Sequence, residues 1–127
     1  MIKKLLLITL LVSSLFAEIE WMKYDDAMIK AKKENKIVMV MLSKKGCGAC
    51  DFMENIVLED EKVISEFTNG FIGVHIDVQE DLIPNGLDYI GTPTFHFINA
   101  KGTKIDTIIG GKKVENFIKK LKEVKAQ

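Results

Sequence analysis

The sequence predicts an α/β domain in which a central mixed β-sheet carries helices on both of its faces. One observation is a continuous apolar run at residues 37–42, which is typical of a strand covered on both faces. Another is a second apolar strand at residues 71–77, followed near the carboxyl end by a hairpin. Helical patterns separate the early strands, so we expect those strands to be parallel and the last two to be antiparallel.

The first predicted element is a helix that runs from residue 24 to about residue 35. Tyr24-Asp25-Asp26 can cap its start, and Ala27, Met28 and Ala31 form its buried stripe. The buried strand at 37–42 and a loop come next.

Two more helices are expected between the apolar strands. The spacing of Cys50, Met53 and Val57 predicts a helix over residues 47–57. A second short helix is indicated around residues 63–67, before the strand at 71–77.

The second half of the chain predicts a turn with a short helix, a hairpin and a closing helix. The turn and short helix cover residues 81–89. The hairpin joins strands at 94–98 and 103–109 through a turn at 99–102. Apolar residues spaced i, i+3, i+4 and i+7 then form the stripe of the closing helix: Val114, Phe117, Ile118 and Leu121.

The first 17 residues predict a secretion signal rather than part of the fold. Lys3 and Lys4 precede an apolar stretch, and the small residue Ala17 stands at a plausible cleavage point. The apolar stretch has about a dozen residues, fewer than the ~20 that a membrane-spanning helix needs. We therefore expect a signal peptide at 1–17, one domain at 18–127 and a periplasmic location. An uncleaved N-terminal anchor is the alternative.

Composition and charge narrow the classes of function. The 127 residues are 47% hydrophobic and 28% charged, as in an ordinary globular domain. Eighteen lysines balance eighteen acidic residues and arginine is absent, which argues against nucleic-acid binding. Two cysteines are too few for a scaffold with several disulfides. We expect a monomer.

The chemistry is expected at Cys47 and Cys50, which enclose Gly48 and Ala49 at the start of a predicted helix. The positive end of a helix stabilises a thiolate, so the pKa of Cys47 should be lowered. Lys44 and Lys45, just before it, act in the same direction. Cys50 lies one turn deeper and is placed to attack a mixed disulfide on Cys47, the arrangement of thiol–disulfide exchange.

Other uses of two cysteines remain open at this point. A structural disulfide is possible, although a bridge that closes so small a loop stabilises little. A zinc site would need His75 and His96, whose separation does not fit a usual ligand spacing. Covalent haem attachment needs a histidine at residue 51, which is aspartate. We expect no metal and no cofactor.

A second motif, Gly91-Thr92-Pro93-Thr94, starts a predicted strand further along the chain. Together with Cys47-Gly48-Ala49-Cys50 it makes residues 21–124 resemble the thioredoxin superfamily. The resemblance implies a thioredoxin fold in which Pro93 is a cis-proline that faces the cysteines. It also implies that the Thr92 backbone binds an extended segment of the substrate. The stretch from Cys47 to Glu54 further resembles periplasmic reductases and the C-terminal domain of the membrane reductant DsbD.

Two positions depart from the superfamily pattern. Gly46 stands where a tryptophan usually precedes the first cysteine, which leaves a more open loop. Met41 stands where many members carry a buried carboxylate that takes a proton from the second cysteine, and it offers the sulfurs a soft apolar contact instead. Cys50 must then lose its proton to water or to a more distant group. Glu54 is a candidate, although a solvated helix residue is the simpler interpretation.

Taken together, these features predict an extracytoplasmic thiol–disulfide oxidoreductase. Because Gly48 and Ala49 provide no charge that would stabilise a thiolate, we expect a reductant of protein disulfides. Its partners would be disulfide-containing or cysteine-containing proteins and a membrane thiol donor of the DsbD type. The alternatives are a disulfide isomerase or oxidase, and a redox-inactive module that binds peptides.

Overall fold

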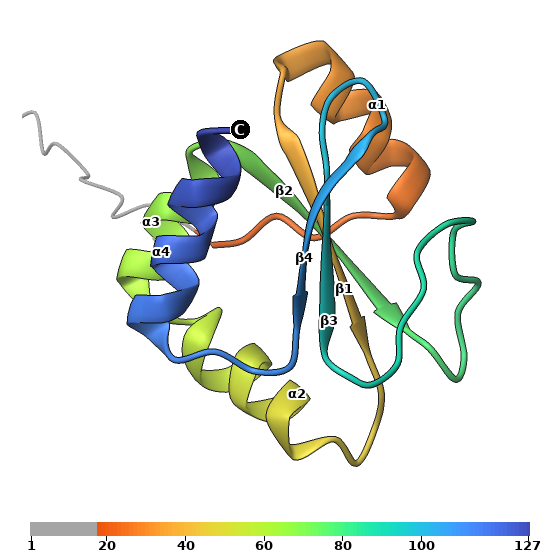
Figure 1. The fold of residues 1–127 in the computed structure, drawn as a ribbon, viewed down its shortest axis with the longest axis vertical. Helices are drawn as coiled ribbons and strands as arrows, with labels where there is room; N and C mark the ends of the chain where they lie inside the picture. The colour runs from red at the N-terminus through yellow and green to blue at the C-terminus, as the bar shows by residue number, and fades with distance from the viewer. Residues whose placement is uncertain (1–17) are drawn as a thin grey trace, which may run out of the picture.

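The structure is a computed structural model that describes residues 18–127 (Figure 1). The predicted signal peptide, residues 1–17, lies outside the described residues. Between residues 18 and 127 no helix is long and apolar enough to cross a membrane.

Four strands form one mixed sheet in the order β2-β1-β3-β4. They are β1 (Ile37–Ser43), β2 (Phe71–Asp77), β3 (Thr94–Ile98) and β4 (Lys104–Ile109). β1 is parallel to β2 and antiparallel to β3, and β3 and β4 form the antiparallel hairpin. The predicted mixed α/β sheet is therefore confirmed.

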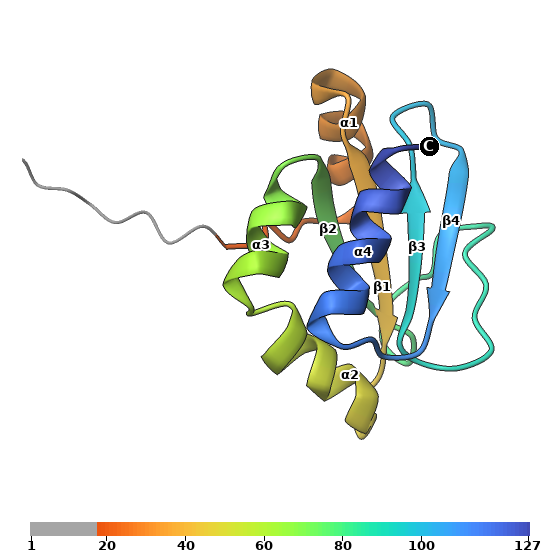
Figure 2. The same ribbon diagram turned by 60° about the vertical axis from the view of Figure 1, so that its left-hand side comes forward.

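The helices lie on both faces of this sheet (Figures 1 and 2). They are α1 (Tyr24–Glu34), α2 (Gly48–Phe52), the π-helical turn η1 (Met53–Val57), α3 (Glu61–Thr68) and α4 (Val114–Lys125). Figure 2 shows α2, α3 and α4 together on one side, while α1 packs on the opposite face.

Alternation along β1 divides the core between the two faces. Val38, Val40 and Leu42 pack with α1, whereas Met39 and Met41 pack with the helices on the other side. Side chains of a strand alternate between faces, so a strand covered on both sides needs apolar residues at every position. This explains the unbroken apolar run in the sequence.

Two local predictions were wrong. The residue that caps α1 is Lys23, without a side-chain hydrogen bond, and Asp25 and Asp26 lie inside the first turn. Carboxylates there still stabilise the helix through its positive amino end. The short helix expected within residues 81–89 does not form. Pro84 and Gly86, which has a φ of 84°, lie in turns and irregular backbone instead.

The edge of β2 is partly covered by the segment that precedes α1. The Gly73 N–H donates to the Glu20 carbonyl at 3.1 Å, and the Met22 N–H donates to the Gly73 carbonyl at 3.0 Å. Trp21 forms a parallel bridge with Gly73 and lies against it. These bonds pair one residue of an otherwise open sheet edge.

Candidate active site

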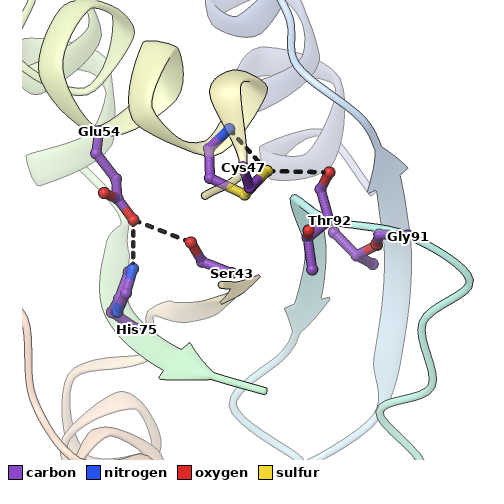
Figure 3. Close-up of a disulfide and its surroundings, with 8 residues drawn as sticks. Ser43, Cys47, Glu54, His75, Gly91 and Thr92 are labelled. Atoms are coloured by element: carbon purple, nitrogen blue, oxygen red, sulfur yellow. Dashed lines mark hydrogen bonds and ion pairs between the residues drawn. A yellow bond between two sulfur atoms is a disulfide. The ribbon is translucent and has the colours of Figure 1, made fainter. Parts of the chain in front are cut away.

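Cys47 and Cys50 form a disulfide at the amino end of α2, with their Cα atoms 5.2 Å apart (Figure 3). Cys47 is the N-cap residue, and its Sγ accepts the Cys50 N–H at 3.1 Å. The sulfur thus occupies the place of a capping oxygen and satisfies one of the unpaired N–H groups of the helix start. Cys47 keeps 8% of its surface exposed, whereas Cys50 has none.

The loop that contains Thr92 and Pro93 faces the disulfide from the start of β3. The Thr92–Pro93 peptide bond is cis. The Thr92 carbonyl oxygen lies 3.4 Å from the Cys47 Sγ. The loop is held on both sides: the Thr94 hydroxyl donates to the Gly91 carbonyl at 2.7 Å, and the Gly110 N–H donates to the Pro93 carbonyl at 2.8 Å.

The residues before the first cysteine lie at the surface. Gly46 has a φ of 75°, a left-handed conformation that favours glycine, and no atom lies within 4 Å of the place where a Cβ would stand. Lys44 and Lys45 are exposed. The Lys45 ammonium pairs with Glu80 at 3.3 Å. The cation of Lys45 is therefore engaged with the loop that follows β2.

Beneath the disulfide the surroundings are apolar. Met41 and Met53 are fully buried in the same core cluster as the two cysteines. The Lys112 N–H donates to the Met53 Sδ at 3.3 Å, so the start of the segment that leads into α4 lies against η1. Gly48 and Ala49 are exposed on the outer side of the bridge.

The family model described as "Thioredoxin-like domain" matches residues 24–125. The chain belongs to the thioredoxin-like family. It is 28% identical over 92 residues to thioredoxin H4-1 of Oryza sativa subsp. japonica, a match that covers 72% of this chain and 67% of that relative.

Two solved structures show the same fold as this thioredoxin-like chain. The solution structure of a thioredoxin from Thermus thermophilus has a TM-score of 0.70 and 25% identity, and the match covers 84% of this chain and 87% of that one. The oxidised C-terminal domain of DsbD from Neisseria meningitidis has a TM-score of 0.60 and 21% identity, with 78% and 90% of the two chains covered. Family membership and the Cys47–Cys50 bridge together make the chain a thiol–disulfide oxidoreductase.

Beside the disulfide lies a polar cluster of Ser43, Glu54 and His75. The sequence did not predict that these three residues would meet. The Ser43 hydroxyl donates to the Glu54 Oε1 at 3.1 Å, and the His75 Nε2 lies 2.6 Å from the same oxygen (Figure 3). Among these residues, Ser43 was missed, Glu54 was considered as a proton acceptor, and His75 was considered as a zinc ligand. The spacing of Glu54 four residues after Cys50 is the one signal in the sequence that points to it.

His96, by contrast, is a buried residue that supports the site loop. Its Nε2–H donates to the Asp88 carbonyl at 2.7 Å, and its Nδ1 lies 3.0 Å from the Thr107 hydroxyl. Burial lowers the pKa of His96, so the ring is neutral at pH 7. Within residues 18–127 no three His, Cys, Asp or Glu side chains are arranged to hold a metal ion.

Proposed function

We propose that the protein is an extracytoplasmic reductant of protein disulfides, in which Cys47 attacks and Cys50 resolves. The observation that carries the proposal is the unequal burial of the two sulfurs at the start of α2. Cys47 is partly accessible and caps the helix, while Cys50 is fully buried behind it. Only Cys47 is placed to meet a sulfur of another protein.

The proposed reaction has two displacements. The Cys47 thiolate attacks one sulfur of the substrate disulfide, which forms a mixed disulfide and releases the other substrate sulfur as a thiolate. Cys50 then loses its proton and attacks the Cys47 sulfur, which closes the Cys47–Cys50 bridge and releases the second substrate thiolate. The substrate gains two electrons and two protons, and the cysteine pair is oxidised.

Thr92 and Pro93 would bind the substrate segment in this reaction. The Thr92 carbonyl already lies 3.4 Å from the Cys47 Sγ, so an extended segment that pairs with the Thr92 backbone would bring its own sulfur to Cys47. Gly46, Gly48 and Ala49 leave the approach to Cys47 free of large side chains.

The direction of electron flow is inferred from charge. No charged side chain stands between the cysteines, and Lys45 is paired with Glu80. Apart from the amino end of α2, little therefore stabilises the Cys47 thiolate of the reduced form, and we expect a low reduction potential. The signal pattern in residues 1–17 supports an extracytoplasmic, periplasmic location. A reductant there needs electrons, which a membrane thiol donor of the DsbD type would supply.

The deciding experiment is the reduction potential of the Cys47–Cys50 pair, measured by equilibration of the purified protein with thiol–disulfide buffers. We expect a value close to the approximately −270 mV of thioredoxin. A value close to the approximately −120 mV of a strong oxidant would contradict the reductant role and indicate a protein that makes disulfides.

A trapping experiment tests the division of labour between the cysteines. Cys50→Ser removes the resolving thiol, so mixed disulfides between Cys47 and substrate proteins should accumulate and be released by a reducing agent. Cys47→Ser is the matched control and should trap nothing. If Cys47→Ser retained full cellular function and peptide binding, the chain would be a binding module that makes no use of its thiols.

A further inference from the structure

The starting observation is that one carboxylate oxygen joins three elements of the fold. Oε1 of Glu54, in η1, accepts the hydroxyl of Ser43 at the end of β1 and pairs with the ring of His75 in β2. The Glu54 and His75 side chains are each about one third exposed, at 33% and 39%. Figure 3 shows this cluster beside the disulfide, beneath the helix that carries both cysteines.

The resolving step needs a group that accepts the proton of Cys50. Before it can attack the mixed disulfide, Cys50 must lose a proton, and it has no exposed surface. Met41 and Met53 share its core cluster and can take no proton. An unpaired charge in such surroundings is costly, so the proton needs an acceptor close by.

Glu54 follows Cys50 by four residues in the continuous helix formed by α2 and η1. Residues four apart on a helix lie on the same side, with Cβ atoms roughly 5–6 Å apart. Here the helix continues from α2 into the π turn η1, closed by the Leu58 N–H that donates to the Met53 carbonyl at 2.8 Å. Single π turns inside helices are frequent at functional sites.

The outer side of the cluster opens to solvent. Glu54 and His75 line a pocket of about 410 Å³ whose wall also includes Trp21 from the segment before α1. The edge of the Trp21 ring faces His75, with ring centroids 6.0 Å apart. Glu18 and Glu59 are the other titratable groups that line this pocket. A proton taken up by Glu54 can therefore leave to water.

We infer that Glu54 accepts the proton that Cys50 loses in the resolving step, and that Ser43 and His75 are positioning residues that hold its carboxylate. In the step, the Cys50 proton passes to Glu54 and the Cys50 thiolate bonds to the Cys47 sulfur. The bond between Cys47 and the substrate sulfur breaks, and the leaving thiolate takes a proton from solvent. The inference rests on the proposed order of attack, Cys47 first and Cys50 second.

The resolving step can be watched separately with a small aromatic disulfide that releases a coloured thiolate. Reduced protein should release one thiolate when Cys47 attacks and a second when Cys50 resolves. We expect Glu54→Gln to leave the first phase unchanged and to slow the second about 100-fold near pH 7, the lower end of what a positioned base contributes. Glu54→Asp should recover part of that loss.

The pH profile separates a proton acceptor from a merely structural residue. In Glu54→Gln the second phase should rise about tenfold per pH unit, because solvent hydroxide replaces the lost base. His75→Gln and Ser43→Ala should slow only the second phase, and by less than Glu54→Gln does. Glu59→Gln, a neighbour in the same pocket, is the control and should behave as the unmodified protein.

Three results would overturn the inference while leaving the proposed function intact. One is a second phase in Glu54→Gln as fast as in Glu59→Gln. Another is equal slowing of both phases, which indicates a general disturbance of the site. A third is an unchanged pH profile in both Glu54→Gln and Glu54→Asp. The absence of any second phase in the unmodified protein would instead contradict the proposed order of attack.

Discussion

At the scale of single residues, Gly73 shows how one missing side chain shapes the sheet edge. A Cβ at this position would lie 2.7 Å from the Trp21 Cε3 and 3.2 Å from the Ile19 Cγ2. The indole therefore packs directly on the backbone of β2. The ring also faces His75, a member of the polar cluster beside the disulfide.

We predict that Gly73→Ala lowers the free energy of unfolding by about 1–3 kcal/mol, the usual cost of overpacking. Urea denaturation followed by circular dichroism would measure it. Gly91→Ala is the control, since no atom lies within 4 Å of a Cβ there and its φ is not left-handed. The loss should shrink in a variant that also carries Trp21→Ala, because the clash is then removed. If the two substitutions changed the free energy of unfolding additively, the side chain that a Cβ at residue 73 displaces would not be Trp21.

The buried side chain of His96 should make the free energy of unfolding depend on pH. Burial lowers its pKa in the folded protein below the ordinary 6.5, which the unfolded chain retains. Below pH 6.5 the unfolded state therefore binds more protons than the folded state, and the free energy of unfolding falls as the pH falls. The contribution of neutral His96 to the free energy of unfolding is fully present above pH 6.5. It is lost as the pH falls through the lowered pKa of His96 in the folded protein.

The measurement is the urea midpoint of the unmodified protein and of His96→Gln between pH 5 and pH 8. The fall between pH 7 and pH 5 should be smaller in His96→Gln, which cannot bind this proton. His75→Gln should retain the full effect of His96. An equal slope in His96→Gln and in the unmodified protein would show that other groups cause the acid sensitivity.

At the scale of elements, the start of α3 depends on one carboxylate. Asp60 is its N-cap and accepts the N–H groups of Lys62 at 2.9 Å and Val63 at 3.3 Å. α3 has eight residues, so its stability comes from this cap and from the packing of Val63 and Phe67 rather than from its length.

We predict that Asp60→Ala destabilises the protein by about 1 kcal/mol, the typical value of an N-cap. Asp60→Asn, which keeps an accepting oxygen, should lose much less. Thermal unfolding of the three proteins would show it. Equal losses in both variants would mean that the charge of Asp60, and not its hydrogen bonds, stabilises the helix.

Elements with strong periodicity were the ones that the sequence predicted well. Residues close together in the sequence determine the apolar run of β1, the strand β2 and the apolar stripe of α4. A local sequence pattern is therefore enough to predict these elements. The cap of α1 was placed wrongly because an acidic residue suits both the cap and the first turn. The helix expected within residues 81–89 does not form, because Pro84 and Gly86 interrupt a segment whose helical pattern is weak.

The candidate site was predictable in part for the same reason. Cys47 and Cys50 are three residues apart in the chain, and Thr92 and Pro93 were found through a family resemblance. The cluster of Ser43, Glu54 and His75 joins β1, η1 and β2. Only the register of β1 beside β2, and the way η1 packs on them, brings its members together. Such a contact has no local pattern in the sequence.

At the scale of the whole molecule, the sheet positions parts of the site that are far apart in the chain. Cys47 follows β1, Thr92 precedes β3, and Gly110 follows β4, while β1, β3 and β4 are neighbours in the sheet. These strand ends lie at the same edge of the sheet, the edge that faces α2 (Figure 1). We therefore expect the redox state of the disulfide to be coupled to the stability of the fold.

This coupling predicts that the oxidised protein unfolds at a higher urea concentration than the reduced protein. If folding lowers the reduction potential of the cysteine pair, then oxidation stabilises the fold by the same free energy, about 1.4 kcal/mol for each 30 mV. We expect the fold to lower the potential because no charged side chain stands between the cysteines and Lys45 is paired with Glu80, so little charge stabilises the Cys47 thiolate of the reduced form. Urea curves of both forms, together with the potential of the pair in the urea-unfolded chain, would close this thermodynamic cycle. A reduced form more stable than the oxidised one would mean that the site stabilises its thiolate, the property of an oxidant, and would contradict the proposed direction of electron flow.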